Sequence, residues 1–249
     1  MVKVFKYKKE YAIKSHEADC HGFLRISSLM NILQDMAAEN ADVLGLGFAV
    51  CHENNLAWVG SNYLIKIQKM PLMNEKIVVQ TWPAEAKLWG AIRDFEIRNE
   101  SGEVIITASS QWVLVDYVRH RPVLLKKYFP NYEPLNERVI NTDFPKMKEV
   151  SEPYEVSVFK VRFDDIDLNR HVNNAVYPVW ASESVDKEFR MKHMVREIEL
   201  AFKKEAVYGE KIEVLTQMSA EESLHTIRDC SGKDVLAICR IVWSEITSS

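Results

Sequence analysis

Hydrophobic and polar residues alternate along much of the chain, as is typical of strands with one buried face. In the first half, alternation marks runs at about 4–14, 57–69, 75–86, 88–99 and 103–118. One segment between the first two runs has helical spacing instead, with apolar residues at Leu29, Ile32, Leu33, Met36 and Ala37. We expect Ser27 or Ser28 to cap this helix, and Gly45 to follow its end.

The second half repeats this order of elements. A strand-like run at 155–163 leads to a second helix, and further runs follow near 195–204, 210–219, 223–229 and 234–246. Two stretches also match in their letters. NEKIVVQTW (74–82) resembles GEKIEVLTQ (209–217), and SGEVIITASSQW (101–112) resembles SGKDVLAICRIVW (231–243). The sequence therefore predicts an α+β protein built from two copies of one strand–helix–sheet unit.

Prolines separate the two copies. Four of the eight prolines fall between them, at Pro130, Pro134, Pro145 and Pro153. Because proline fixes the backbone and donates no hydrogen bond, this stretch favours an extended linker. We predict an N-terminal domain over 1–127, a linker over 128–153 and a C-terminal domain over 154–249.

Composition narrows the function classes. A net charge of −4 over 249 residues argues against a general nucleic-acid binder, which usually carries a basic excess. The four cysteines form no CxxC pair, which favours a reducing compartment. The start of the sequence has no signal-peptide core, and no stretch approaches the roughly 20 apolar residues of a membrane helix. We expect a soluble, cytoplasmic protein with no membrane span.

The densest polar chemistry lies in RFDDIDLNRHVNNAVYPVW, residues 162–180. Asp167, Asn169 and His171 alternate there, so in an extended segment all three side chains would leave one face. A carboxylate, an amide and an imidazole grouped in this way are suited to acid–base chemistry.

An apolar helix follows this polar segment. Pro178 fits the first turn of a helix but not its interior, so we expect the helix to begin near Asn174 or Ala175. Free backbone N–H groups at a helix start favour negative charge. We therefore expect the N–H groups of Val172–Asn174 to face a developing anion.

The two copies are expected to share a fold, so a polar residue present in only one of them is not required for folding. At the positions of Asp167, Asn169 and His171, the first copy has Asp19, His21 and Phe23. When NEKIVV is aligned with GEKIEV, Met70 of the first copy falls at the position that Glu205 has in the second. Only the second copy carries the complete polar set, which indicates one active half.

The pattern DxNxHVNNxxYxxW, from Asp167 to Trp180, resembles the acyl-acyl carrier protein (acyl-ACP) thioesterases. ISSLMNILQDMAAENA, WPAEAKLWGAIRDFEI and ASSQWVLVDYVRHRP also look like the N-terminal domain of that family. The resemblance implies two tandem hotdog domains, each an antiparallel sheet wrapped around a long helix. It also implies hydrolysis of fatty acyl thioesters in fatty acid biosynthesis, with an acyl carrier protein as partner.

The same resemblance assigns site residues. Asp167, Asn169 and His171 occupy the family's DxNxH positions, and Glu205 matches its downstream glutamate. Plant members often carry a cysteine after that glutamate, and Ala206 here excludes a cysteine nucleophile at that position.

Two routes remain open. In the first, Glu205 or Asp167 activates a water, while His171 is oriented by a carboxylate and Asn169 holds the water or the carbonyl. In the second, Asp167 attacks the carbonyl and forms an acyl anhydride.

The substrate also needs an apolar slot and a docking surface. We expect the slot, which the resemblance places in the N-terminal domain, to be lined by Met30, Ile32, Leu33 and Met36. The densest basic residues that could meet an acidic carrier are Arg119, His120, Arg121, Lys126 and Lys127. The histidines show no metal-ligand spacing, so we expect no metal and no cofactor beyond the substrate's phosphopantetheine arm.

Three alternatives share the expected fold: an acyl-CoA thioesterase, a non-catalytic sensor of acyl thioesters, and a hotdog dehydratase or hydratase. Two fused copies already supply an internal dimer, and a homodimer of the whole chain is compatible with that arrangement.

Overall fold

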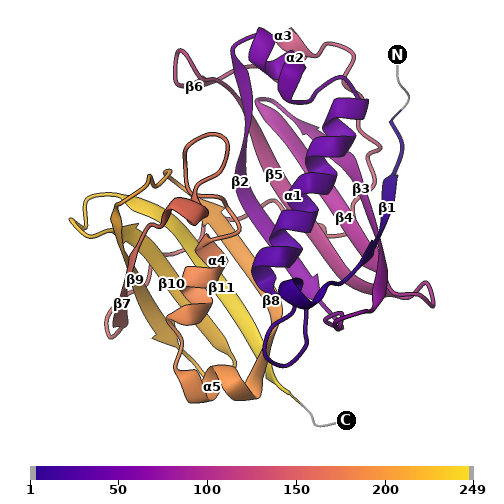
Figure 1. Ribbon diagram of the computed structural model, residues 1–249. Helices are drawn as coiled ribbons and strands as arrows, with labels where there is room; N and C mark the ends of the chain where they lie inside the picture. The colour runs from indigo at the N-terminus through magenta and orange to yellow at the C-terminus, as the bar shows by residue number, and fades with distance from the viewer. Residues whose placement is uncertain (1–3, 247–249) are drawn as a thin grey trace. The chain divides into compact units, whose positions relative to one another are not determined.

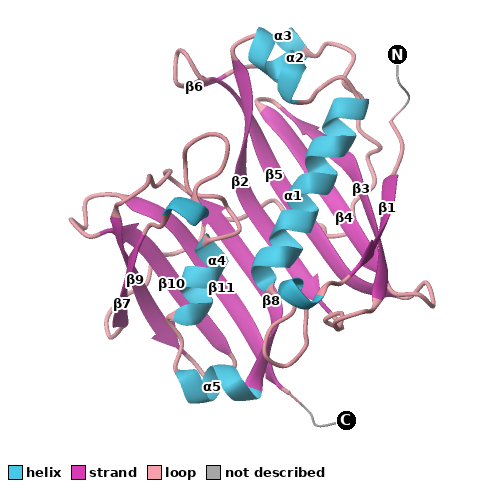
Figure 2. Ribbon diagram, in the orientation of Figure 1, coloured by secondary structure: helices cyan, strands magenta, loops and turns pink. Residues whose placement is uncertain are grey.

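The structure, a computed structural model, describes residues 4–246. It divides into two compact units, Met1–Phe144 and Pro145–Ser249, and each unit places helix against an antiparallel sheet (Figures 1 and 2). The outermost residues of the two expected domains, 1–3 and 247–249, lie outside the described residues. None of the helices within residues 4–246 has both the length and the hydropathy needed to cross a bilayer.

The first unit contains a sheet with the strand order β1-β3-β4-β5-β2, and a long helix, α1, lies across one face of that sheet (Figure 1). The helices are α1 (Ile26–Val43), α2 (Phe48–Glu53) and α3 (Leu125–Tyr128). The strands are β1 (Tyr7–Ala12), β2 (Leu56–Ile67), β3 (Lys76–Lys87), β4 (Gly90–Arg98), β5 (Val104–Asp116) and β6 (Arg121–Pro122), the last pairing with β5.

Helix α1 begins slightly earlier than predicted. Its N-cap is Arg25, which makes no side-chain capping bond, so Ser27 and Ser28 lie inside the first turn. The expected apolar stripe is buried, as are Met30 and Asn40, and the helix ends at Val43 before Gly45.

Residues 128–144, expected as the first part of a linker, pack on the first unit instead. Arg138 forms an ion pair with Glu85 (Nη1–Oε2 2.8 Å), and the Val139 N–H donates to the Asp94 carboxylate at 2.7 Å. The buried Asp94 carboxylate needs such partners, because an unpaired buried charge is costly. Apolar residues of the same segment cover Trp82 of the sheet.

The second unit repeats the arrangement with the strand order β8-β11-β10-β9-β7. Its strands are β7 (Glu155–Lys160), β8 (His193–Phe202), β9 (Lys211–Met218), β10 (Glu222–Asp229) and β11 (Val235–Glu245). The first strands of the two units share a register: Tyr11 is opposite Ile77, and Phe159 is opposite Ile212. The structure therefore confirms the alignment of NEKIVV with GEKIEV.

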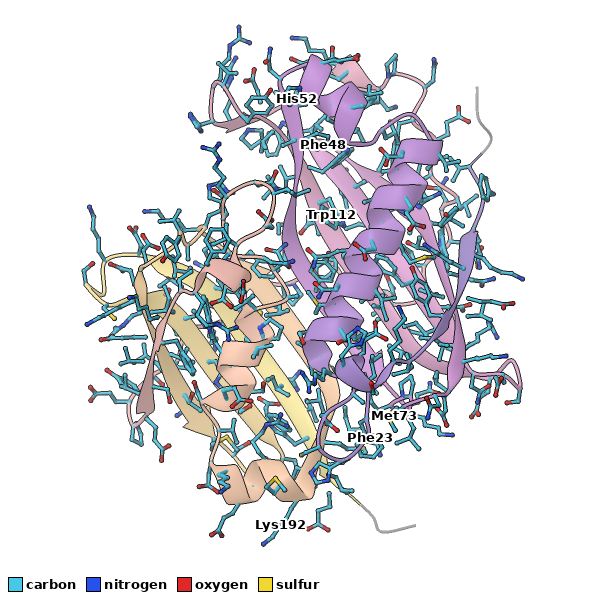
Figure 3. All side chains as sticks on the ribbon, viewed as in Figure 1. Phe23, Phe48, His52, Met73, Trp112 and Lys192 are labelled. Carbon is cyan, nitrogen blue, oxygen red and sulfur yellow. The ribbon has the colours of Figure 1, made fainter. Side chains whose placement is uncertain are left out.

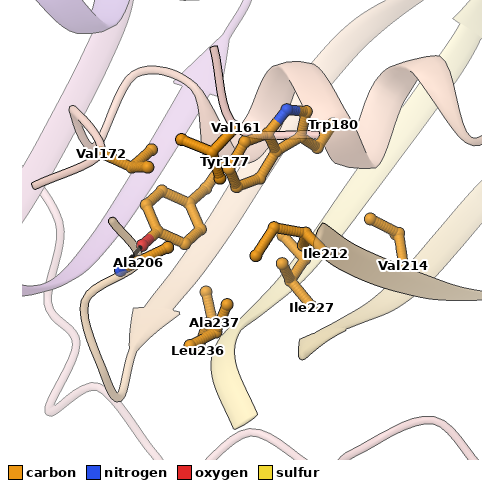
Figure 4. Packing of buried hydrophobic residues seen from close by; sticks show 10 residues of the cluster. All are labelled: Val161, Val172, Tyr177, Trp180, Ala206, Ile212, Val214, Ile227, Leu236 and Ala237. Atoms are coloured by element: carbon orange, nitrogen blue, oxygen red, sulfur yellow. Dashed lines mark hydrogen bonds between the residues drawn. The ribbon is translucent and has the colours of Figure 1, made fainter. Parts of the chain in front are cut away.

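The helix of the second unit is shorter than expected. It consists of α4 (Tyr177–Glu183), followed after a break by α5 (Lys187–Lys192), whose N-cap Asp186 accepts hydrogen bonds from two backbone N–H groups. Helix α4 buries Tyr177 and Trp180 against apolar side chains of the sheet (Figure 4). Helix α4 therefore needs only seven residues, because Tyr177 and Trp180 are large side chains that fill the space against the sheet.

Candidate functional site

The polar segment before α4 is a closed loop rather than an extended strand. The Asp167 N–H donates to the His171 carbonyl at 2.9 Å, and the Arg170 N–H donates to the Asp167 carbonyl at 3.0 Å. Arg170 adopts a positive φ of 65°, which reverses the chain direction. An isolated bridge between Ile166 and Val172 closes the loop.

Asp167 holds this loop with its side chain. One carboxylate oxygen accepts the Asn169 N–H at 2.8 Å, and the other lies 3.4 Å from the Asn169 amide nitrogen. Asp167 is half-buried and Asn169 is exposed. These two predicted site residues therefore form one pair.

Glu205 meets His171 from a different part of the chain. Strand β8 ends at Phe202, because the Lys203 and Lys204 N–H groups both donate to the Leu236 carbonyl, at 2.8 and 3.1 Å. The chain then turns, so Glu205 lies outside the strand and its direction is not set by the strand alternation, although its side chain remains exposed.

The two segments are joined by a backbone bond from the Val172 N–H to the Ala206 carbonyl at 2.9 Å. Beside it, Glu205 Oε2 lies 3.3 Å from His171 Nδ1, with side-chain exposures of 57% and 37%. The carboxylate therefore lies beside Nδ1 of the imidazole, and the other ring nitrogen, Nε2, makes no hydrogen bond with residues 4–246. The structure thus brings the four predicted residues together as two pairs, Asp167–Asn169 and His171–Glu205.

Tyr177 is a site residue that sequence reasoning treated only as part of an apolar stripe. Its buried hydroxyl accepts the Ala206 N–H at 3.3 Å, which anchors the chain immediately after Glu205 (Figure 4). Burial, followed by the nearby Glu205 carboxylate, raises the pKa of Tyr177 well above its usual range, so the phenol stays protonated. Its place six residues after His171 in the HVNNxxY pattern was the available signal.

The backbone donors differ from the prediction. The Val172 and Asn173 N–H groups are engaged, by the Ala206 and Asp165 carbonyls, both at 2.9 Å. Of the three predicted groups, only the Asn174 N–H lacks an acceptor among residues 4–246. Helix α4 also starts at Tyr177, later than expected, because a turn stabilised by the Asn173 side chain precedes it.

The predicted slot and carrier residues lie in the first unit. The four side chains expected to line the slot belong to α1 and are all buried. The basic residues expected to meet a carrier lie on exposed segments: Arg119, His120, Arg121, Lys126 and Lys127.

Comparison with known proteins places the chain in a family. The family model for the acyl-ACP thioesterase N-terminal domain matches residues 4–130, and the model for the C-terminal domain matches residues 148–245. The chain is 27% identical over 232 residues to an oleoyl-acyl carrier protein thioesterase of Arabidopsis thaliana, covering 85% of this chain and 63% of that protein. It is also 27% identical over 270 residues to a palmitoyl-acyl carrier protein thioesterase of the same plant, covering 97% of this chain and 64% of that protein. The chain thus spans less than two thirds of the length of these relatives.

Two solved structures share the fold. An acyl-ACP thioesterase from Bacteroides thetaiotaomicron superposes with a TM-score of 0.83 at 23% identity, covering 96% of this chain and 98% of the other. A 12:0-ACP thioesterase from Umbellularia californica gives a TM-score of 0.84 at 20% identity, with 97% and 98% covered. The two units are tandem hotdog domains, as the sequence predicted. Because the family models together match most of its length, the chain belongs to the acyl-ACP thioesterase family.

Proposed function

We propose that the protein hydrolyses fatty acyl thioesters of an acyl carrier protein, releasing a free fatty acid and the carrier thiol. Membership of the family supports this proposal. The observation that carries it is the 3.3 Å contact between His171 Nδ1 and Glu205, which supplies an oriented imidazole on an accessible loop. The reaction needs no cofactor apart from the phosphopantetheine arm of the substrate.

In this proposal His171 is the general base. A proton on Nδ1, donated toward Glu205, leaves Nε2 free to accept a proton from water as that water attacks the thioester carbonyl. The imidazolium then returns the proton to the departing sulfur. Glu205 stabilises the imidazolium, a role for which its exposed position is less effective than a buried one would be.

Asn169 and the backbone provide the polar contacts to the carbonyl. The exposed Asn169 amide can donate to the carbonyl oxygen or hold the water, and the Asn174 N–H is the backbone donor still available for the oxyanion. Asp167 keeps this loop closed through its bonds to Asn169.

The competing route makes Asp167 a covalent nucleophile. Its carboxylate oxygens already interact with Asn169, which supports the water route. Single turnover in ¹⁸O-water distinguishes the two, because only an acyl–Asp167 intermediate transfers label from water to the aspartate. Label in Asp167 would overturn the water route.

The direct test is product analysis with purified protein. An acyl-ACP series and the matched acyl-CoA series would be offered under the same conditions, with free thiol and fatty acid measured together. We expect turnover with a higher kcat/KM on the carrier substrates. Tight binding without turnover would identify a sensor, and equal or faster CoA turnover would identify an acyl-CoA thioesterase.

A further inference from the structure

A buried cation lies in the first unit with no counterion. Arg93, on β4, is 8% exposed, and its Nη1 donates to Asn40 Oδ1 at 2.7 Å and to Thr81 Oγ1 at 3.2 Å. No carboxylate of residues 4–246 forms an ion pair with it. Burial lowers the pKa of Arg93 to about 10, so the guanidinium remains charged at neutral pH.

Asn40 reaches this guanidinium from α1 and is itself incompletely paired. Its oxygen accepts from Arg93, but its Nδ2, fully buried, has no acceptor among residues 4–246. Buried polar groups of native proteins are nearly always hydrogen-bonded, so an orphan donor beside an uncompensated cation points to a missing acceptor. The two groups have the chemistry of a small site for an oxygen-bearing ligand.

This polar site lies at one end of an apolar layer. On the side of the sheet that faces α1, paired residues of β2, β5 and β4 form rows, of which the first, Ile67–Ile106–Ile97, is apolar. The next row, Ile65–Ala108–Phe95, is apolar as well. The third row is Tyr63–Ser110–Arg93. Trp112, labelled in Figure 3, follows on β5, and its indole N–H donates to the Ser110 hydroxyl at 2.8 Å. The layer beneath α1 therefore changes from apolar to polar at the row of Arg93, which Asn40 of α1 contacts.

The second unit shows that the fold does not require this change. The matching row there is Ile198–Ile241–Ser223, so a neutral serine occupies the position of Arg93. Arg93 therefore has no counterpart in the second unit, just as His171 and Glu205 have none in the first. A charged residue that the fold does not require is a candidate for a function of the first unit.

We propose that Arg93 and Asn40 form a polar site beneath α1 in the first unit, and that this site binds an oxygen acceptor at the end of an acyl chain held in the adjoining apolar layer. A terminal carboxylate is the ligand that fits best, because it neutralises the guanidinium and accepts from the Asn40 amide. A methyl end would leave the Asn40 amide without an acceptor and the Arg93 guanidinium without a counterion. The inference rests on the proposed function for its substrate, but the site itself is defined by the first unit alone.

The test uses binding rather than turnover. S-alkyl pantetheine thioethers contain no thioester, and a pair of equal chain length can end in a methyl group or in a carboxylate. We expect isothermal titration calorimetry to show the carboxylate-ended thioether binding at least tenfold more tightly to the full chain. Equal affinity, or no binding of either ligand, would overturn the proposal.

Variants separate the site from general packing. Arg93→Met retains side-chain length without charge and should abolish the preference, whereas Arg93→Lys should retain part of it. Arg98→Met, on the same strand but half-buried and paired with Glu96, is the matched control and should leave the preference unchanged. If Arg93→Met fails to fold, Asn40→Leu provides the second measurement, with a smaller loss of preference expected. A retained preference in Arg93→Met, or in Asn40→Leu where that variant replaces it, would refute the site.

The outcomes also distinguish this inference from the proposed function. A chain that binds the carboxylate-ended thioether preferentially but releases no thiol from any acyl thioester keeps the site and loses the hydrolase assignment. A chain that hydrolyses acyl-ACP but binds the two thioethers equally well keeps the hydrolase assignment and loses the Arg93–Asn40 site.

Discussion

The two units build the same loop ahead of their helices, with the same backbone bonds. In the first unit the Asp19 N–H donates to the Phe23 carbonyl at 2.8 Å, and the Asp19 carboxylate accepts the His21 N–H at 2.9 Å. In the second, Asp167 makes the corresponding bonds to His171 and Asn169, at 2.9 and 2.8 Å. The aspartate therefore holds the loop in both units, whether or not a histidine follows.

The loops are also tied to the following strand in the same way. Leu24 N–H donates to the Pro71 carbonyl at 2.8 Å, as Val172 N–H does to that of Ala206 at 2.9 Å. The preceding residue differs, since Met70 is buried whereas Glu205 is exposed.

The difference extends to the anchor beneath the loop. Pro71 has no N–H to donate, and the residue of α1 that matches Tyr177 is Leu29, which has no hydroxyl. The hydrogen bond between Ala206 and Tyr177 thus exists only in the unit that carries His171 and Glu205. The loop of the first unit therefore folds without counterparts of His171 and Glu205, so we expect these two side chains to be exchangeable with little effect on folding.

The largest expected effect on activity comes from replacing His171 of the second loop with phenylalanine, the residue at the same position of the first loop. His171→Phe should lower kcat/KM by roughly 10²–10⁴-fold, because the proposed general base is lost. The melting temperature should stay close to wild type, since Phe23 occupies this position in the first loop. Phe23→His is the matched control and should leave activity unchanged. Substantial hydrolysis by His171→Phe would remove the imidazole from the mechanism.

A second effect concerns stability in acid. His225 occupies the position of Phe95 in the other sheet, buried between the Thr216 and Ser223 hydroxyls, and burial lowers its pKa to about 3. Because the unfolded histidine titrates near 6.5, its contribution is complete above that pH and is lost as pH falls toward 3.

Between pH 6.5 and 4.5 this histidine should therefore cost wild type about 2–3 kcal/mol of unfolding free energy. Urea titrations of wild type and His225→Phe at the two pH values measure the difference, and the variant should lose less stability on acidification. An identical loss in both proteins would contradict the assignment.

A smaller loss of activity is expected at Glu205. Glu205→Met, which copies Met70, should reduce kcat by roughly 10- to 10²-fold with little change in KM, because the exposed carboxylate orients the imidazole rather than binding substrate. Glu205→Asp should recover part of the rate. Steady-state kinetics distinguish this result from a binding role, in which KM would rise at constant kcat.

Tyr177→Phe should cost about 1–3 kcal/mol of unfolding free energy, because the buried Ala206 N–H is left without its acceptor. Loosening of the Glu205 segment should also lower kcat several-fold. Tyr11→Phe is the control, since the Tyr11 hydroxyl is buried without a partner among residues 4–246, and it should be neutral. Chemical denaturation and kinetics on both variants measure the two effects, and equal behaviour of the pair would reject an anchoring role.

The smallest effect concerns the turn. Arg170 has a φ of 65° where the first loop has Gly22 at 83°, a conformation that strains residues with a side chain. Arg170→Gly should raise the unfolding free energy by up to about 1 kcal/mol with activity unchanged, and Gly22→Ala should lower it by a similar amount. A destabilised Arg170→Gly variant would show that the arginine side chain supports the loop.

Most of the strands could be predicted from the sequence because alternation survives wherever one face is buried. The strands from β2 to β5 and from β8 to β11 begin and end within a few residues of the expected positions. The pairing of His171 with Glu205 depended on where β8 ends, and the alternation pattern could not decide that point.

Other features depended on long-range contacts. Arg93 and Asp94 are adjacent charges in a strand and gave no sign that both are buried. Their side chains contact different segments, because Arg93 donates to Asn40 of α1 whereas Asp94 accepts from Val139. The role of Tyr177 depends on a backbone N–H that is remote in sequence.

The segment 128–144 determines how the protein can be divided for experiments. A fragment ending at residue 127 would lack the apolar residues that pack on Trp82 and the Arg138 and Val139 bonds to Asp94. Its sheet would then expose the Trp82 ring and an unpaired Asp94 carboxylate to solvent. Separate production of the first repeat should therefore extend to Phe144, at the boundary between the two units.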